Sequence, residues 1–515
     1  MGLSAHATIC AMDTLASYDE LPYDSLPLPE TQPDVLAALA KLHGFDAPDP
    51  RCARILELGC AQGGNLIPLA WRWPESDCVG VELSRVQAQA GADFVQRLGL
   101  ANARILHADL TALPDDLGSF DYIIAHGVFS WVPPDVQGAL LDVCRRHLSP
   151  NGLAYVSFNV AAGWQHLRPL REALVARTDA RLPAPERYRQ ALAALDDLEA
   201  EWLDPLLLKE IAYLKTAAPS YLFHEYLADT NAAINFADFA AMLDAYCLRY
   251  VGEAGPRRAQ VELEDAWGLI PESMAGRWQD AEIAIDDAFA IRFRRALIAH
   301  EDAPCAQPPR VDALSGLAFY TDLSSDEEID LDEKIEQRFV NPAGNQFPVS
   351  LPALKAGLMV LSARYPAALD YSALCKATAA LLAEYGVAGF DEPAFRQALF
   401  DFLLLHGVTA TVWSGCFADE PGDFPEAHAL ARAQARAPGW VVSGARHVAV
   451  DLDFAGRLLL GALDGSRTLE ALSAWMQQAL AESDLHLPLE QVLELTHQQL
   501  WLYARQGLMA QPADY

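Results

Sequence analysis

Short apolar runs recur along the first third of the chain and alternate with polar turns and stretches of helical periodicity. Each run is long enough for one buried strand, and several end on an acidic residue or a glycine. Strands and helices that alternate in this way predict an α/β domain built on a parallel sheet. The five runs span residues 54–58, 78–82, 103–110, 120–127 and 148–158.

Outside these runs the pattern is mainly helical. Apolar residues at helical spacing predict helices over 34–42, 188–202, 235–246 and 286–300, and alternating residues predict a strand pair between Trp440 and Asp453. We therefore expect an amino-terminal arm with the α/β domain at 1–165, a mainly helical domain at 166–302, an acidic, proline-containing linker at 303–336 and a mixed, mostly helical, winged-helix-like domain at 337–515.

The first run leads into the glycine-rich turn Gly59–Asn65, where missing side chains let the backbone approach a ligand. The turn could pass for a relaxed dinucleotide fingerprint, and no Gly-Lys-Ser/Thr follows it, which excludes a P-loop. Glu57, at the end of the run, would repel a pyrophosphate but suits a ligand with an ammonium group. Glu82, at the end of the next run, is placed for ribose hydroxyls, and Asp109 for an adenine amine.

Charge narrows the class of partner. The chain has 515 residues and a formal net charge of −33, so its surface repels phosphate backbones. Arg292, Arg294 and Arg295 fall in the predicted helix 286–300 and are interpreted as a solvated helix face. We expect no nucleic-acid partner; a basic or lysine-bearing protein is more compatible.

The sequence gives little support for membrane insertion, export or a metal site. No apolar run approaches the roughly 20 residues of a membrane span, and Met1–Asp19 lacks a basic leader, which predicts a cytoplasmic protein without stable membrane insertion. The nine cysteines form no C-x-x-C pair, and His224-Glu225 fails the H-E-x-x-H pattern because residue 228 is alanine. No metal is therefore expected.

Motifs along nearly the whole chain carry a family resemblance. They are Tyr18-Asp19-x-x-Pro22-Tyr23, the segments 58–68 and 126–132, Tyr221-Leu222-x-His224-Glu225-Tyr226-Leu227, and the segments 292–297, 430–435 and 463–467. With the ordered runs, they resemble class I S-adenosylmethionine (SAM) methyltransferases that carry a methyltransferase regulatory domain. That group includes the protein-lysine methyltransferases of bacterial outer-membrane proteins. The resemblance implies a Rossmann-like sheet, SAM as cofactor, and methyl transfer to lysines of a protein, such as an outer-membrane protein before export.

The resemblance also implies site residues. For the cofactor they are Tyr18, Glu57, Gly59, Ala61, Gly63, Asn65, Glu82, Leu83, Asp109, Leu110, His126 and Gly127. For the acceptor they are Phe129, Trp131, His224, Glu225 and Tyr226, with His224 or Glu225 accepting a proton or orienting the amine. Each aromatic residue has packing as its plainer alternative, and His126 could simply cap its loop.

One departure from the family pattern concerns the acceptor. Where the family usually shows Asn-Thr-Tyr-Pro-Gly-Trp, this chain has Asn159-Val160-Ala161-Ala162-Gly163-Trp164. Without the tyrosine and proline, two other functions stay open. One is a small-molecule methyltransferase with a helical lid, and the other is a SAM-binding regulator or scaffold without turnover.

Overall fold

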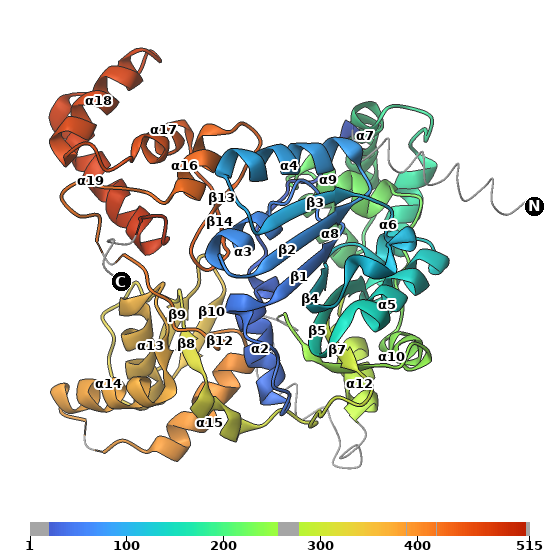
Figure 1. Cartoon of the computed structure of the whole chain (residues 1–515), viewed down its shortest axis with the longest axis horizontal. Helices are drawn as coiled ribbons and strands as arrows, with labels where there is room; N and C mark the ends of the chain where they lie inside the picture. The colour runs from blue at the N-terminus through green and yellow to red at the C-terminus, as the bar shows by residue number, and fades with distance from the viewer. Residues whose placement is uncertain (1–19, 256–277, 388, 419, 511–515) are drawn as a thin grey trace, which may run out of the picture.

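The computed structural model describes residues 20–255, 278–387, 389–418 and 420–510, and a seven-stranded sheet lies at its centre (Figure 1). The strand order is β3-β2-β1-β4-β5-β7-β6, with β1 to β5 parallel and β7 antiparallel to both of its neighbours. The strands are β1 Arg54–Leu58, β2 Asp77–Glu82, β3 Ala103–His107, β4 Phe120–Ala125, β5 Leu148–Asn159, β6 Leu248–Glu253 and β7 Phe293–His300. The predicted α/β, Rossmann-like fold is confirmed.

Helices cover both faces of this sheet (Figure 1). Successive strand residues alternate between the faces: Ile55 and Tyr122 pack under α2 and α3, whereas Leu56 and Ile123 pack under α5 and α10. All four side chains are fully buried, which is why the strands read as apolar runs. The helices of this part are α2 Pro33–Leu42, α3 Leu66–Arg72, α4 Arg85–Leu98 and α5 Pro134–His147.

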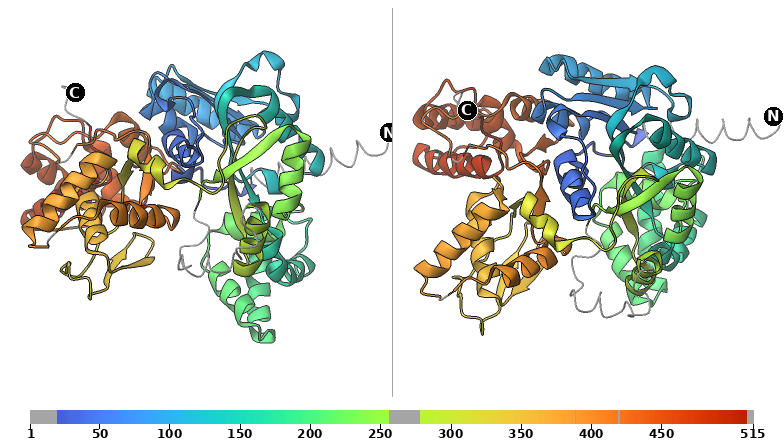
Figure 2. Two further views of the ribbon diagram at one scale, coloured as in Figure 1. Left: turned by 90° about the horizontal axis from the view of Figure 1, so that it is seen from below. Right: turned by 60° about the horizontal axis from the view of Figure 1, so that its bottom comes forward.

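The segment after β5 is mainly helical, as predicted. The expected helices at 188–202 and 235–246 are confirmed as α7 and α10. The elements are α6 Ala161–Ala176, α7 Ala184–Glu201, α8 Pro205–Leu214, α9 Pro219–Leu222, a π-helical turn η6 Phe223–Leu227, α10 Phe236–Ala245 and α12 Trp278–Phe289. They lie beside the part of the sheet that contains β5, β7 and β6 in both views of Figure 2.

The predicted helix over 286–300 is wrong in its second half. Residues 293–300 form β7, which pairs with β5 and β6, so the sheet takes its last two strands from the range expected to be a helical domain. The arginines do not form a solvated helix face either: Arg294 is 2% exposed and paired with Glu253, Glu282 and Asp286. Arginine is rarely buried unless it is paired with acids. A sequence does not show such pairing, so it predicts an exposed position for Arg294.

Two further clusters of elements follow. The first combines the sheet β11-β8-β12 with helices and a hairpin; the second is helical with a short strand pair. The first contains η8 Val311–Gly316, β8 Ala318–Tyr320, β9 Gln337–Val340, β10 Gln346–Val349, α13 Pro352–Arg364, β11 Leu369–Asp370, α14 Tyr371–Glu384, α15 Glu392–Leu404 and β12 Thr409–Thr411. The second contains α16 Ala429–Arg436, β13 Val442–Ser443, β14 Ala449–Val450, α17 Phe454–Ala462, α18 Leu469–Ala481 and α19 Leu489–Arg505.

The acidic stretch 326–335 packs on the first of these clusters. The buried Lys355 of α13 donates from Nζ to the carbonyl oxygens of Asp330, Asp332 and Ile335, at 2.9, 2.7 and 2.5 Å. Carbonyl dipoles therefore satisfy a buried ammonium that a sequence would place on the surface.

The carboxyl-terminal cluster docks on the helices of the large sheet (Figure 1). Trp440 stacks on Phe94 of α4 with ring centroids 3.8 Å apart, and Leu430 and Ile67 complete a small apolar cluster there. The β13–β14 hairpin, residues 440–450, thus lies beside the glycine turn. Among the described residues, no helix combines the length and hydropathy that a membrane-spanning segment requires.

Candidate active site

The glycine turn leaves β1 at the carboxyl edge of the sheet. Gly59 and Gly63 have φ angles of 70° and 84°, a region that favours glycine, and Ala61 is also left-handed at 49°. A Cβ on Gly59 would lie 2.7 Å from Cγ2 of Val128. The amides of Gly59 and Cys60 donate to the carbonyl oxygen of Val81, which fixes the turn to β2. The site therefore requires glycine at position 59 both for its φ angle and for space.

Glu57 places a buried carboxylate under this turn. Its Oε1 accepts from Nδ2 of Asn65 at 3.0 Å, whereas Oε2 is buried and has no hydrogen-bond partner among the described residues. Burial raises the pKa of Glu57 to about 8, since the charged form loses its hydration. A ligand ammonium at Oε2 would supply the missing partner.

Glu82 ends β2 and faces the same turn. Its Oε2 accepts from the amide of Ala61 at 2.9 Å and its Oε1 from the amide of Ser84 at 2.7 Å. These bonds hold the carboxylate at the strand end. Next to it, Leu83 is 44% exposed.

Asp109 and Leu110 follow β3. Oδ1 of Asp109 accepts from the amide and the hydroxyl of Thr111, so the residue caps the short turn that begins at Leu110. The Asp109 side chain is exposed and Leu110 is half-buried. Both lie at the same sheet edge as Glu82, because β3 pairs with β2 in parallel register.

His126 and Gly127 follow β4. Nδ1 of His126 lies 2.8 Å from the hydroxyl of Tyr155, and the imidazole stacks on that ring. Burial lowers the pKa of His126 to about 4, so it is neutral. The amide of Gly127, at φ 65°, donates to Oγ of Ser157 at 2.8 Å. Both capping of the loop and contact with a ligand are compatible with this geometry.

An amino-terminal arm, residues 20–32, covers the glycine turn. Oγ of Ser25 accepts from the amide of Gly64 at 2.7 Å, and the amide of Leu28 donates to Oδ1 of Asn65 at 2.9 Å. A Cβ on Gly64 would lie 2.0 Å from the carbonyl oxygen of Ser25, so glycine lets the two backbones touch. Tyr18, predicted to contact the cofactor, lies outside the described residues.

The arm also reaches the π-helical turn η6. His224 is buried, with Nε2 2.7 Å from the carbonyl oxygen of Leu21, and its ring packs on Tyr23. The hydroxyl of Tyr23 donates to Oε1 of Glu225 at 3.1 Å. Burial raises the pKa of Glu225 to about 7, and the Tyr23 bond opposes the rise. Tyr23 contacts η6 and Ser25 contacts the glycine turn. These two arm residues are separated by at most about 7 Å of extended chain.

The remaining predicted acceptor residues separate into two groups. Phe129 is fully buried and packs edge-on against Phe158 and Phe239, and Tyr226 donates its hydroxyl to Oε1 of Glu210 at 2.6 Å. Both side chains are buried. Trp131 is half-buried at the end of the turn η5 Phe129–Trp131, which follows β4.

Two hydrogen bonds tie the segment after η6 to the end of β5 and to η5. Nδ2 of Asn159 donates to Oδ1 of Asn231 at 3.0 Å, and the amide of Ala232 donates to the carbonyl oxygen of Ser130 at 2.8 Å. The ends of β4 and β5, the arm and η6 therefore meet around one edge of the sheet. Ala161 and Ala162, which stand where the family usually has tyrosine and proline, begin α6 directly beside this junction.

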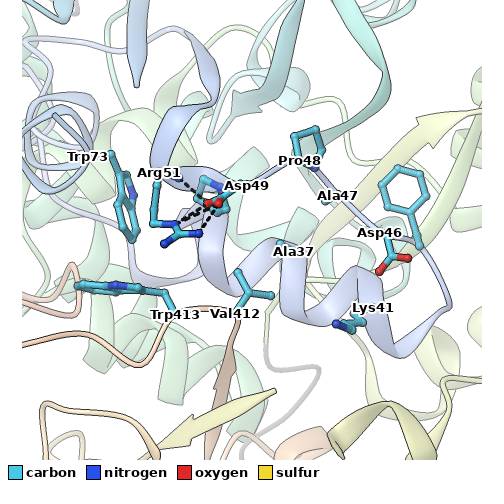
Figure 3. Close-up of a pocket in the computed structure, with 12 residues that line it drawn as sticks. Ala37, Lys41, Asp46, Ala47, Pro48, Asp49, Arg51, Trp73, Val412 and Trp413 are labelled. Atoms are coloured by element: carbon cyan, nitrogen blue, oxygen red, sulfur yellow. Dashed lines mark hydrogen bonds and ion pairs between the residues drawn. The ribbon is translucent and has the colours of Figure 1, made fainter. Parts of the chain in front are cut away.

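A separate pocket lies between α2, the loop after it and the segment after β12 (Figure 3). Trp73 and Trp413 meet edge to face there, 4.8 Å between centroids, and Arg51 pairs with Asp49 at its rim. None of the predicted site residues lines it. The lining residues are Ala37, Lys41, Phe45, Asp46, Ala47, Pro48, Asp49, Pro50, Arg51, Trp73, Val412 and Trp413.

Comparison with protein families matches three parts of the chain. Residues 55–152 match the family described as "Methyltransferase domain", residues 218–300 the "Predicted methyltransferase regulatory domain", and residues 423–499 "PKMT, C-terminal winged helix domain". The chain belongs to the class I SAM-dependent methyltransferases. Its cofactor is therefore S-adenosylmethionine, and methyl transfer is its reaction.

Two proteins of Rickettsia prowazekii strain Madrid E are among the relatives of this methyltransferase. Uncharacterized protein RP789 is 39% identical over 242 residues, which are 46% of this chain and 44% of RP789. Uncharacterized protein RP028 is 34% identical over 229 residues, 43% of this chain and 92% of RP028. The match thus spans less than half of RP789. Trans-aconitate 2-methyltransferases match shorter stretches, with 30% identity over 149 residues for the one from Azoarcus sp. strain BH72.

A solved structure shares the fold over nearly the whole chain. PKMT2 from Rickettsia typhi in complex with AdoHcy has a TM-score of 0.81 at 21% identity, covering 95% of this chain and 100% of PKMT2. The similarity extends through the two clusters that follow the large sheet. It supports the predicted order of a Rossmann-like domain, a mainly helical part and a carboxyl-terminal part.

The sequence reasoning missed three contributors to this site. Ser25 and Thr31 of the arm and His447 of the β13–β14 hairpin contact the glycine turn or its Asn65. The motif ending at Tyr23 and the proline spacing identified the arm but not its polar contacts. No local pattern could have assigned His447, which is 382 positions from Asn65 in the chain.

Proposed function

We propose that this methyltransferase transfers the methyl group of SAM to lysine side chains of a protein. The family match at 423–499 and the fold shared with PKMT2 support a protein-lysine acceptor. The observation that carries the proposal is the joint placement of Tyr23 and Glu225: the arm that covers the glycine turn also hydrogen-bonds a half-buried carboxyl group on η6.

The cofactor is proposed to lie along the carboxyl edge of β1, β2 and β3. Oε2 of Glu57 receives the ammonium group, directly or through a water, and Glu82 accepts from the ribose hydroxyls. Leu83 packs on one face of the adenine, with Asp109 and Leu110 at its edge. Gly59, Ala61 and Gly63 provide the close backbone approach, while His126 and Gly127 border the sulfonium end.

The acceptor amine must be neutral to attack the methyl group. Deprotonating a free lysine, with a pKa of about 10.4, costs about 4–5 kcal/mol at pH 7. Burial beside the positive sulfonium lowers that pKa, and Glu225 accepts the proton or orients the amine. The N–CH3 bond forms as the S–CH3 bond breaks, and S-adenosylhomocysteine leaves. Trp131 and His224 are proposed to border the path of the side chain.

The partner is proposed to be a lysine-bearing protein, such as an outer-membrane protein before export, met in the cytoplasm. A net charge of −33 favours basic protein segments and disfavours nucleic acid. The eight cysteines among the described residues are all free thiols, which agrees with a reducing compartment.

A transfer experiment with blocked lysines tests this proposal. The full-length enzyme is given SAM with a labelled methyl group and a bacterial protein extract that includes solubilised outer-membrane proteins. A matched extract is first acetylated at its lysines. We expect labelled protein from the first extract and a loss of at least tenfold in the second.

Equal labelling of both extracts would contradict a lysine acceptor. Label confined to small molecules would favour the lid-covered small-molecule enzyme that the trans-aconitate relatives suggest. No label in either fraction, with SAM binding established separately, would favour a regulator or scaffold.

A further inference from the structure

The β13–β14 hairpin of the carboxyl-terminal part reaches into the cofactor site. It turns tightly at 444–448, where the amide of Gly444 donates to the carbonyl oxygen of Val448 at 2.8 Å. His447, in this turn, has a φ angle of 59°, which is uncommon for a residue other than glycine. Such a conformation persists only where the surroundings fix it, and it is a reason to ask what the side chain does.

The imidazole of His447 contacts Asn65 of the glycine turn. The side chain is 2% exposed, and Nε2 lies 2.6 Å from Oδ1 of Asn65. Because Nδ2 of Asn65 donates to the Glu57 carboxylate, Oδ1 is the accepting end of the amide, and Nε2 of His447 must carry the hydrogen. The amide of Leu28 and the hydroxyl of Thr31 donate to the same oxygen.

These contacts form a chain from the hairpin to the ligand-facing carboxylate. His447 holds the oxygen of Asn65, and Asn65 holds Oε1 of Glu57, which leaves Oε2 for the ammonium of SAM. A reversed amide would point its oxygen at the carboxylate, so the donors on Oδ1 fix the orientation that holds Glu57.

We propose that His447 is a positioning residue of the SAM site and that the carboxyl-terminal part of the chain thereby completes that site. This inference rests on the proposed placement of the SAM ammonium at Glu57. It assigns the distant hairpin a role in cofactor binding rather than in acceptor binding alone.

The hairpin is anchored independently of His447. The guanidinium of Arg446 lies over the rings of Tyr320 and Phe417 and donates to the carbonyl oxygens of Pro366 and Ser414. A variant at position 447 should therefore keep the hairpin in place, and glycine suits the φ angle there.

Isothermal titration of the full-length protein with SAM tests the inference, using wild type, His447→Gly, His447→Gln and the matched control His486→Ala, an exposed histidine of the same part. Losing one hydrogen bond should raise the Kd of His447→Gly about five- to tenfold. Gln can donate from a similar position, so it should stay within about twofold of wild type, as should the control.

A double-mutant cycle separates positioning from general stabilisation. In an Asn65→Ala background, adding His447→Gly should change the Kd by less than about twofold, since its contact is already gone. Wild-type affinity in His447→Gly, no rescue by Gln, or an undiminished effect in the Asn65→Ala background would each overturn the inference. SAM binding that follows the predicted pattern, without any methyl-lysine formed, would overturn the proposed acceptor and leave this inference standing.

Discussion

At the scale of single residues, Glu57 is the group through which the proposed cofactor site should respond to pH. The sequence placed an acid at the end of the first strand, and the structure shows one oxygen bound to Asn65 and the other without a partner among the described residues. That pattern of one satisfied and one orphaned oxygen is a property of packing, which the sequence could not reveal.

The raised pKa of Glu57 predicts that the affinity for SAM depends on pH. With the pKa of Glu57 near 8, the carboxyl group is protonated below that pH and must lose a proton to bind an ammonium. The Kd should therefore fall as pH rises from 6 to 8, by up to about tenfold per unit. Titration calorimetry in buffers of different ionisation enthalpy should also detect the released proton.

Glu57→Gln is the matched control, because it keeps the shape and loses the charge. It should bind SAM more weakly at pH 8 and lose most of the pH dependence. A wild-type Kd that is constant between pH 6 and 8 would rule out Glu57 as the partner of the ammonium.

The hydrogen bond from Tyr23 lowers the pKa of Glu225, the residue proposed to act on the acceptor amine. The Tyr23 hydroxyl donates to the carboxylate and thereby lowers a pKa that burial has raised. Tyr23→Phe should raise the pKa of Glu225 further and move the acidic limb of the kcat/KM profile to higher pH, by about half a unit to one unit. A profile superimposable on that of wild type would exclude Glu225 as the titrating base.

At the scale of elements, strands and helices were predictable where burial alone decides them. The runs 54–58, 78–82 and 120–127 became β1, β2 and β4, the last of which ends two residues earlier than predicted. Helix 34–42 became α2, with its start one residue earlier. The failure at 286–300 has a specific cause: Arg294 is buried against three acids that all lie outside its own strand, one on β6 and two on α12. Charge neutralisation by distant residues leaves no local pattern.

The contact between the arm and the glycine turn depends on Gly64. Because a Cβ at position 64 would meet the carbonyl oxygen of Ser25, Gly64→Ala should displace the arm and destabilise the protein by about 1–3 kcal/mol. Thermal unfolding with and without SAM measures both effects, and the stabilisation by SAM should shrink.

Ser25→Ala makes a milder version of this test. It removes only the acceptor of the Gly64 amide, so it should cost about 1 kcal/mol. Equal melting temperatures for Gly64→Ala and wild type would contradict the close contact between arm and turn.

At the scale of the whole molecule, the cofactor site is assembled from widely separated segments. The arm, the glycine turn, η6 and the β13–β14 hairpin all contribute contacts around one sheet edge. The sequence predicted the glycine turn and the strand ends beside it, because motif spacing is local. It predicted a strand pair between Trp440 and Asp453, but not that this hairpin contacts Asn65 of the glycine turn, because that contact follows from packing between distant segments.

The packing of Trp440 on Phe94 holds that arrangement. Trp440→Ala should remove a stacked, nearly buried ring and weaken the docking of the carboxyl-terminal part by about 3–5 kcal/mol. Calorimetric unfolding should then show an earlier separate transition. Trp501→Ala, at a tryptophan that is 44% exposed, is the control and should change stability by less than about 0.5 kcal/mol.

The central claim is that a SAM methyl group reaches a lysine side chain of a protein. The most direct test is to digest protein labelled by the full-length enzyme to amino acids and identify the modified residue by mass spectrometry, with Glu225→Gln as a parallel sample. We expect N-methylated lysine as the labelled amino acid and a lower yield from Glu225→Gln. Label on another amino acid, with lysine unmodified, would contradict it.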